Sequence, residues 1–324
     1  MLNDHPHVNP DTCERVRSAI IELGYVPSSH ARALKGKPNN SVALIVSDVS
    51  NPFFAALTRG VEDVAEEHGF SLILCNADRG KAKQRRYLER LLAHGIKGVI
   101  VAPAMDTLSD LKSLAERGVD LVVVDWRYPL PEADNVYTDS IGGARQLTEH
   151  LLELGHQRIG IISGPPGDVT AEDRVAGYRL ALADAGLEPN PDYIFFGRFD
   201  APSGSANCTR LLSLDPRPTA LVTGNNRIAV GAYQAILAHG LQVPRDVALA
   251  SFDEAPFDAA LATTLTAMVQ PDYEMGRTAA QLLIERLRGQ RSRGDRREVV
   301  FQARLVVRSS CGSKPAVPAA HRLS

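Results

Sequence analysis

The chain has 324 residues, of which 44% are hydrophobic and 23% charged, so it can form two folded domains with large apolar cores. Its formal net charge of -2 excludes binding to nucleic acid through a generally basic surface, so any such contact must be local. The cysteines are scattered without a CxxC or Cys/His cluster, which indicates reduced thiols and argues against a metal site or a disulfide framework. The first residues do not have the pattern of a signal peptide, and no apolar run approaches about 18 residues. We therefore expect a cytoplasmic protein without membrane contact.

A helical segment opens the chain, and a polar linker follows it. Apolar residues recur at helical spacing at Val16, Ala19, Ile20 and Leu23. Asn9 and Pro10 suit the start of a helix and Gly24 suits its end, so the sequence predicts a helix over residues 10–23 whose apolar stripe needs a partner. On composition alone, residues 25–41 are typical of an interdomain linker.

From Ser41 onward, predicted strands and helices alternate. The strands are expected at residues 42–49, 71–77, 98–104, 120–126, 158–163, 193–199, 219–225, 246–253 and 299–307. The helices are expected at residues 51–70, 81–94, 108–117, a segment that Gly155 ends, 174–185, 203–214, 228–239 and 273–288. This alternation is the pattern of doubly wound parallel sheets, and two such α/β sheets fit between residues 41 and 308. The end of the chain from Ser309 has the small, Pro-rich composition of a disordered tail.

Polar and aromatic side chains follow the predicted strands, at the edge where open parallel sheets bind ligands. The candidate ligand-binding residues are Asn51, Phe53, Phe54, Asp125, Trp126, Arg174, Phe199, Asn225, Asp253 and Gln270. Aromatic faces with carboxylates, amides and a guanidinium suit a sugar, whose C–H faces pack on rings while its hydroxyls form hydrogen bonds. Taken singly, Phe53 and Phe54 are more typical of a core. Taken singly, Asp125 and Asp253 are typical of helix caps, and Arg174 is typical of a surface helix. It is the shared position of these residues after successive strands that favours a ligand-binding site.

The sequence predicts no catalytic or metal-binding residues. The GPPG at 164–167 lacks both the GxGxxG pattern and the P-loop Lys, and no GxSxG elbow or Ser/Cys with a His base in a motif occurs. The adjacent carboxylates of Asp253 and Glu254 leave an acid/base pair open, without further support. We therefore expect a binding protein without a cofactor, and not an enzyme.

Several motifs, taken together, resemble those of a known family. They are YVPSSHARALKG, NPFF, VVDW, DSIGGARQLTEHLLELGHQRIGIISGP, DRVAGY, TGNN and VPRDVALASFD, in this order. The combination resembles the LacI family of transcription regulators over nearly the whole chain, and its wording is most similar to the ribose repressors of that family. The resemblance implies a DNA-binding regulator, and more narrowly a repressor, that binds operator DNA as a homodimer and responds to a small sugar.

The resemblance also implies a division of the chain. It places a remnant of a helix-turn-helix headpiece at 1–24, a hinge at 25–40, one effector subdomain at 41–139 with 271–298, a second at 140–270 with 299–308, and a disordered tail at 309–324. Both subdomains are expected to have the type I fold of periplasmic binding proteins.

The resemblance further implies contacts between the hinge and DNA. Residues at the family's DNA-contacting positions are Ser28, Ala31, Arg32, Leu34 and Lys35. Leu34 is expected to act as an apolar wedge in the minor groove. The first two headpiece helices, one of which reads bases, are expected before residue 1, and a late start or a trimmed chain would explain their absence. The chain as given is therefore expected to bind DNA weakly, with little sequence preference.

By the same resemblance, the candidate ligand-binding residues other than Trp126 stand where ribose-binding domains contact their sugar, which makes a pentose such as ribose the expected effector. The ribose-type pocket has an Arg at the position of Trp126, and the adjacent Arg127 is a candidate substitute. Asn226 stands where the motif usually has an Asp, and Asp168 stands where purine repressors have a ligand-contacting Arg, which disfavours a purine. A free sugar-binding protein and a sugar-modifying enzyme remain as alternatives. The hinge motif and the missing signal peptide oppose the first, and the lack of a nucleophile opposes the second.

Overall fold

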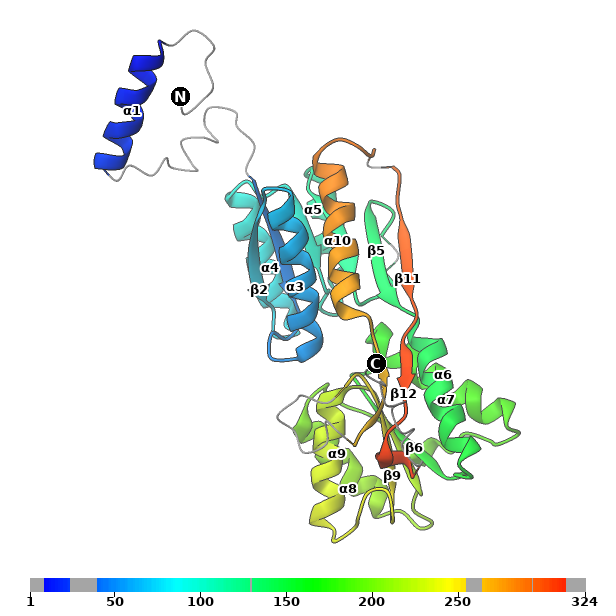
Figure 1. Ribbon diagram of the computed structural model, residues 1–324. Coiled ribbons are helices and arrows are strands. Elements are labelled where there is room, and N and C mark those ends of the chain that lie inside the picture. Colours follow the sequence, from blue (N-terminus) through cyan, green and yellow to red (C-terminus); the bar gives the residue numbers. More distant parts are fainter. Residues whose placement is uncertain (1–8, 24–39, 129, 255–263, 293, 313–324) are drawn as a thin grey trace, which may run out of the picture. The chain divides into compact units, whose positions relative to one another are not determined.

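The computed structural model describes residues 9–23, 40–128, 130–254, 264–292 and 294–312 (Figure 1). The chain divides into two compact units, residues 1–40 and residues 41–324. Among the described residues, no helix has both the length and the apolar character that crossing a bilayer requires.

The first unit contains helix α1, Pro10–Glu22. Asn9 caps it, because the Asn9 Oδ1 accepts a hydrogen bond from the Asp11 N–H at 3.0 Å. The predicted N-terminal helix is therefore confirmed, although Ile21 and Leu23 are 81% and 78% exposed. The predicted DNA-contacting residues lie outside the described residues, and they are Ser28, Ala31, Arg32, Leu34 and Lys35.

The second unit contains two sheets of six strands each. The first sheet has the order β11-β5-β4-β3-β1-β2, and all of its neighbouring strands are parallel. Its strands are β1 (Ser41–Val46), β2 (Ser71–Asn76), β3 (Gly98–Val101), β4 (Asp120–Val124), β5 (Ala133–Thr138) and β11 (Glu298–Phe301). Its helices are α3 (Pro52–Glu67) and α10 (Asp272–Leu287) on one face, and α4 (Lys81–Ala93) and α5 (Leu108–Glu116) on the other.

The second sheet has the order β12-β10-β9-β8-β6-β7 and is parallel except for β12, which runs antiparallel to β10. Its strands are β6 (Ile159–Ser163), β7 (Ile194–Phe196), β8 (Ala220–Thr223), β9 (Ala248–Phe252), β10 (Thr266–Val269) and β12 (Arg304–Val306). Its helices are α6 (Ser140–Glu153) and α7 (Val169–Asp184) on one face, and α8 (Ala201–Leu212) and α9 (Asn226–Ala238) on the other. Among the described residues there are also two 3-10 turns, η1 (Pro191–Tyr193) and η2 (Ser309–Cys311). The predicted architecture of two doubly wound α/β sheets is confirmed.

Alternate residues of the central strands enter different cores. Along β1, Val42, Leu44 and Val46 pack with α3 and α10. Ala43 and Ile45 of the same strand pack with α4 and α5. Because both faces are covered, the strand needs apolar residues at every position, which is why these strands read as continuous hydrophobic runs.

Two strands were not predicted, and one predicted strand is divided. β5 carries the polar residues Asp134 and Asn135, and β10 has only four residues, so neither has the long apolar run of its neighbours. The strand expected at 299–307 is two strands, because β11 pairs with β5 of the first sheet and β12 pairs with β10 of the second. The chain therefore passes between the sheets at residues 302–303, and not before Val299.

The disordered tail predicted from Ser309 starts too early. Ser310 and Cys311 are each 1% exposed. The Ser310 hydroxyl donates a hydrogen bond to the Leu249 carbonyl at 2.6 Å and accepts one from the Thr266 N–H at 2.8 Å. These hydrogen bonds join η2 to β9 and β10, so this turn is part of the folded core around the second sheet.

A buried ion cluster joins α10 to β5. The Asp134 carboxylate accepts hydrogen bonds from the Arg286 guanidinium at 2.7 and 2.8 Å and from the Arg291 guanidinium at 3.0 and 3.1 Å. It also accepts one from the backbone N–H of Arg297 at 2.7 Å. The side chains of Asp134 and Arg286 are 0% and 1% exposed. Burial opposes ionisation of Asp134, but the hydrogen bonds from these arginines keep the pKa of Asp134 below its usual value. The cluster ties the late helix to the middle of the chain.

We expect Asp134→Asn to lower the free energy of unfolding by about 3 to 5 kcal/mol, because it leaves buried guanidinium groups without their counter-ion. Since the pKa of Asp134 is lowered in the folded state, its stabilisation is present above about pH 4 and is lost as the pH falls through the folded pKa. Urea unfolding at several pH values measures this effect. Asp184→Asn is the control, because Asp184 forms an exposed ion pair with Arg145. A loss no larger than that of the control would contradict the prediction.

Candidate functional site

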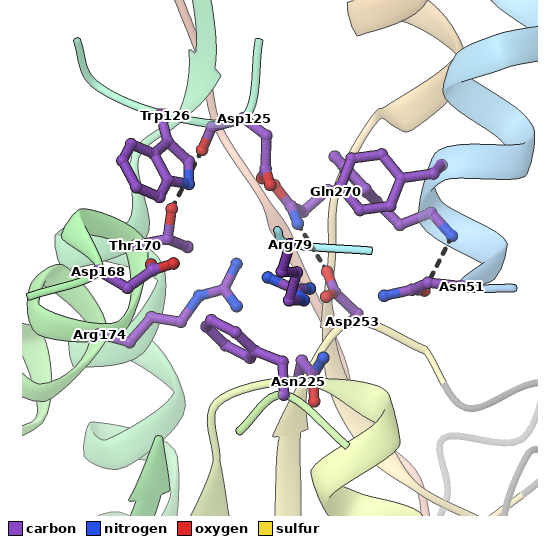
Figure 2. A pocket seen from close by; sticks show the side chains of 13 residues that line it. Asn51, Arg79, Asp125, Trp126, Asp168, Thr170, Arg174, Asn225, Asp253 and Gln270 are labelled. Carbon is purple, nitrogen blue, oxygen red and sulfur yellow. Dashed lines mark hydrogen bonds between the residues drawn. The ribbon is translucent and has the colours of Figure 1, made fainter. Parts of the chain in front are cut away.

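A cavity of about 320 Å³ lies beyond the carboxyl ends of strands from both sheets. Its lining residues are Asn51, Phe53, Phe54, Arg79, Asp125, Trp126, Asp168, Thr170, Arg174, Phe199, Asn225, Asp253 and Gln270 (Figure 2). The structure thus brings together every candidate ligand-binding residue of the sequence, and it adds Arg79, Asp168 and Thr170.

Asp125 and Asp253 occupy equivalent places in the two sheets. Asp125 follows β4, Asp253 follows β9, and each of these strands is the third from the same end of its sheet. Both residues have a left-handed backbone, with φ of 68° and 65°. The Asp125 N–H donates to the Val136 carbonyl at 3.0 Å, and the Asp253 N–H donates to the Met268 carbonyl at 2.9 Å. Left-handed backbone is unfavourable for most side chains and clusters at functional sites, and here it brings both carboxylates to the cavity.

The carboxylates of the cavity are costly to ionise. Burial and, to a smaller extent, the negative charge of Asp253 raise the pKa of Asp125 to about 6, against the attraction of Arg174. Burial also raises the pKa of Asp253 and of Asp168. A ligand that donates hydrogen bonds to these oxygens would therefore relieve an unfavourable charge.

Arg174 supplies hydrogen-bond donors from α7. Its side chain is buried, its Nη1 donates to the Gly224 carbonyl, and its guanidinium lies 3.8 Å from the centroid of the Phe252 ring. Its Nε has no hydrogen-bond partner among the described residues. On another side of the cavity, the Gln270 Nε2 donates to the Asp253 Oδ1 at 2.6 Å. The position of Arg174 excludes the surface role that its sequence alone suggests, and its unused donor suits an oxygen of a ligand.

Three helix caps fix polar groups at the cavity. Asn51 caps α3, Asp168 caps α7 and Asn225 caps α9, with side-chain oxygens that accept backbone N–H groups at 3.2, 3.0 and 2.9 Å. Because a cap is held by the first turn of its helix, these side chains have little freedom to move. The cap at Asp168 also starts α7 five residues before the predicted start at Arg174.

Aromatic side chains form the apolar part of the lining. Phe53 and Phe54 pack edge to face, with ring centroids 5.0 Å apart. Trp126 and Phe199 are each 6% exposed. The Thr170 hydroxyl beside Trp126 donates to the backbone carbonyl of Asp125 at 3.2 Å (Figure 2). Aromatic faces with fixed polar groups between them suit a ligand that has both apolar faces and hydroxyls.

Neither Arg127 nor Asn226, the two residues linked to departures from the ribose-type pattern, lines the cavity. Arg127, the candidate substitute for the missing Arg, forms an ion pair with Asp173 at 3.0 Å and is 54% exposed. Asn226 donates to the Asn51 Oδ1 at 3.1 Å and to the Glu254 carbonyl at 2.9 Å. Arg79, which the sequence did not single out, lines the cavity instead. The signal for it is its place after β2, which ends at the same edge as the neighbouring strands.

The fold and the site define a class of protein with two α/β sheets and a cavity, lined by buried polar and aromatic side chains, at the carboxyl ends of their strands. Within the described ranges, no three His, Cys, Asp or Glu side chains are placed to hold a metal ion.

Comparisons with known proteins agree with this class. Residues 39–308 match the family described as "Periplasmic binding proteins and sugar binding domain of LacI family". The chain is 33% identical to the HTH-type transcriptional repressor PurR of Aliivibrio salmonicida, over 96% of this chain and 93% of that protein. It is 34% identical to the ribose operon repressor of Escherichia coli, over 89% of this chain and 87% of that protein. The solved complex of the transcriptional regulator CelR with cellobiose superposes with a TM-score of 0.76 at 32% identity, and the match covers 95% of this chain and 93% of that one. The chain therefore belongs to the LacI family of transcription regulators, and its function is that of a regulator and not of an enzyme.

We expect Asp125→Asn to stabilise the ligand-free protein by about 1 to 3 kcal/mol at about pH 7, because the variant removes a buried charge. The pKa of an Asp in the unfolded chain is about 4, whereas the pKa of Asp125 in the folded protein is about 6. The stability of the natural protein should therefore fall as the pH rises between these values, and the gain in the variant should be small at about pH 4 and full above about pH 6. Thermal unfolding across this range measures the gain.

Asp106→Asn is the matched control, because Asp106 has a similar φ of 56° but is exposed. A gain that is equal at both ends of the pH range, or no gain beyond that of the control, would contradict the burial of a charged Asp125.

Proposed function

We propose that the chain is a ligand-responsive repressor whose cavity binds a small sugar, with a pentose such as ribose as the expected effector. The observation that carries this proposal is the convergence of all the predicted ligand residues on one cavity, where aromatic faces alternate with buried hydrogen-bonding groups. The name of the similar ribose operon repressor supports the same class of ligand. As part of the proposal, residues 41–139 with 271–301 and residues 140–270 with 304–308 form the two effector subdomains. Residues 28–35 within the hinge at 25–40 contact operator DNA in the cytoplasm.

The roles of the lining residues follow from their chemistry. Asp125 and Asp253 accept hydrogen bonds from sugar hydroxyls, while Arg174, Asn225 and Gln270 donate to or accept from the same hydroxyls. Phe53, Phe54, Trp126 and Phe199 pack against the C–H faces of the ring, and Asn51 completes the polar set. A neutral sugar leaves the guanidinium groups to balance the carboxylates, so no further charge has to be buried.

We expect isothermal titration calorimetry to detect a pentose, and we expect Asp253→Asn to weaken its binding by about 2 kcal/mol through the loss of a buried charged hydrogen bond. Asn is the suitable replacement, because it tolerates the left-handed backbone of Asp253. The panel includes pentoses, hexoses and purine bases, and Asp106→Asn again controls for the change of residue type. If only the purine bases gave heat of binding, the proposed sugar effector would be wrong and the effector would be a purine. If Asp253→Asn bound the pentose with unchanged affinity, the proposed contact between the Asp253 carboxylate and the sugar would be wrong.

We also infer a homodimer, because an operator with two symmetric half-sites requires a two-fold protein. A surface for it is available on β2, the edge strand of the first sheet, where Ile73 and Leu74 are 37% and 43% exposed. An apolar edge strand of this kind promotes association unless it is covered.

Analytical ultracentrifugation at micromolar concentration should give a dimer, and Leu74→Lys should shift it toward monomer because the variant places a charge on the apolar edge. The control is Leu180→Lys, since Leu180 has a similar exposure of 46% but lies on α7. A monomer or a tetramer for the natural chain would contradict the proposed assembly.

A further inference from the structure

Arg79 reaches the cavity from a turn with unusual backbone geometry. Asp78 and Arg79 follow β2, and both have a left-handed backbone, with φ of 49° and 56°. The turn is held in place, because the Asp78 carboxylate accepts hydrogen bonds from Asn76 at 2.8 Å and from Lys83. The Arg79 N–H donates to the Ser47 carbonyl at 3.0 Å. Two consecutive left-handed residues other than glycine are unfavourable and persist only where the surroundings fix them, as at ligand-binding turns.

The guanidinium of Arg79 has unused donors. It lies 4.6 Å from the centroid of the Phe199 ring, and within the described part of the chain it has no hydrogen bond or ion pair. Burial lowers the pKa of Arg79, and the carboxylates of Asp168 and Asp125 oppose that effect. Arg79 thus faces negative groups without touching them, and Figure 2 shows it in the middle of the labelled side chains. A guanidinium with five N–H groups and only an aromatic contact is available to bind oxygen atoms of a ligand.

Arg79 and Phe199 also separate two cavities. The inner cavity is the one of about 320 Å³ described above. An outer cavity of about 830 Å³ adjoins it, and its lining residues are Ser47, Asp48, Asp78, Arg79, Pro165, Arg198, Phe199 and Asp200. Only Arg79 and Phe199 belong to both linings. Arg79 and Phe199, which are in contact with each other, therefore form the shared wall between the smaller cavity and the larger one.

We propose that Arg79 contacts the ligand and determines its size: it donates hydrogen bonds to the sugar in the inner cavity, and with Phe199 it closes that cavity so that a single sugar ring fits. This proposal rests on the proposed sugar-binding function. From the turn after β2, Arg79 brings a guanidinium to the same cavity in which Trp126 stands where the resemblance implies an Arg. Replacement of Arg79 by a shorter residue joins the two cavities and makes room for a second ring.

Calorimetry with D-ribose, D-xylose, D-glucose and cellobiose tests this role in the natural chain and in Arg79→Asn. Asn removes the guanidinium but tolerates a left-handed backbone, so the turn is retained. We expect monosaccharide affinity to fall at least about tenfold, since hydrogen bonds to charged groups are lost. We expect cellobiose affinity to stay equal or to rise, so the preference for the single ring should shrink. Arg79→Lys should also weaken monosaccharide binding, because an ammonium lacks the planar fork of donors.

The control is Arg198→Ala, because Arg198 lines only the outer cavity and pairs with Asp200 at 2.8 Å on the surface. It should change monosaccharide affinity by less than about twofold, as surface ion pairs contribute little. If the natural chain binds the monosaccharides and both Arg79 variants bind them with the same affinity, the proposed role of Arg79 is wrong, while the sugar-binding function stands. No heat from any of the sugars in the natural chain would refute the sugar-binding function, and this inference with it. Circular dichroism melting of each variant checks that a loss of binding is not a loss of folding.

Discussion

Parallel strands of one sheet all end at the same edge, and the cavity of this protein depends on that constraint. β4 and β9 have the same place in their respective sheets, and each is followed by an aspartate with left-handed backbone. Because the N–H groups of Asp125 and Asp253 bond to the neighbouring strands, the sheets themselves position the two carboxylates. Asp168 caps α7 at the corresponding edge, and Arg174 follows on the same helix. The side chains of the site are thus held by strands and helix ends of the two sheets.

The protein buries charge in two different ways. At Asp134, arginines and a backbone N–H satisfy the carboxylate, so the pKa of Asp134 is lowered and the cluster stabilises the fold. In the cavity, the pKa of Asp125 is raised because burial outweighs the attraction of its neighbours, and the Arg174 Nε has no hydrogen-bond partner among the residues that the structure describes. A satisfied cluster serves stability, whereas an unsatisfied one is ready for a ligand. This contrast separates the structural ion cluster from the binding site without reference to any relative.

The sequence was sufficient for the features that depend on local pattern. Long apolar runs predicted the central strands, and the rule about strand ends predicted Asp125, Arg174 and Asp253 as neighbours. β5 and β10 were missed because a short or partly polar segment becomes a strand only when neighbouring strands offer their hydrogen bonds. Arg79 was missed for a related reason: in a DRG turn a charged residue suggests a surface position, and only the tertiary bond to Ser47 and the left-handed backbone aim it at the cavity.

Trp126 is the only tryptophan of the chain, and it lines the cavity, so its fluorescence reports directly on what binds there. A titration of the purified protein with pentoses, followed by tryptophan emission, tests whether this cavity is the sugar site. We expect a saturable change in intensity or emission wavelength with at least one pentose, because a bound sugar changes the surroundings of the indole ring. Glycerol at the same concentrations should give no saturable change. An emission spectrum that stays constant with every pentose would contradict the assignment of the effector to this cavity.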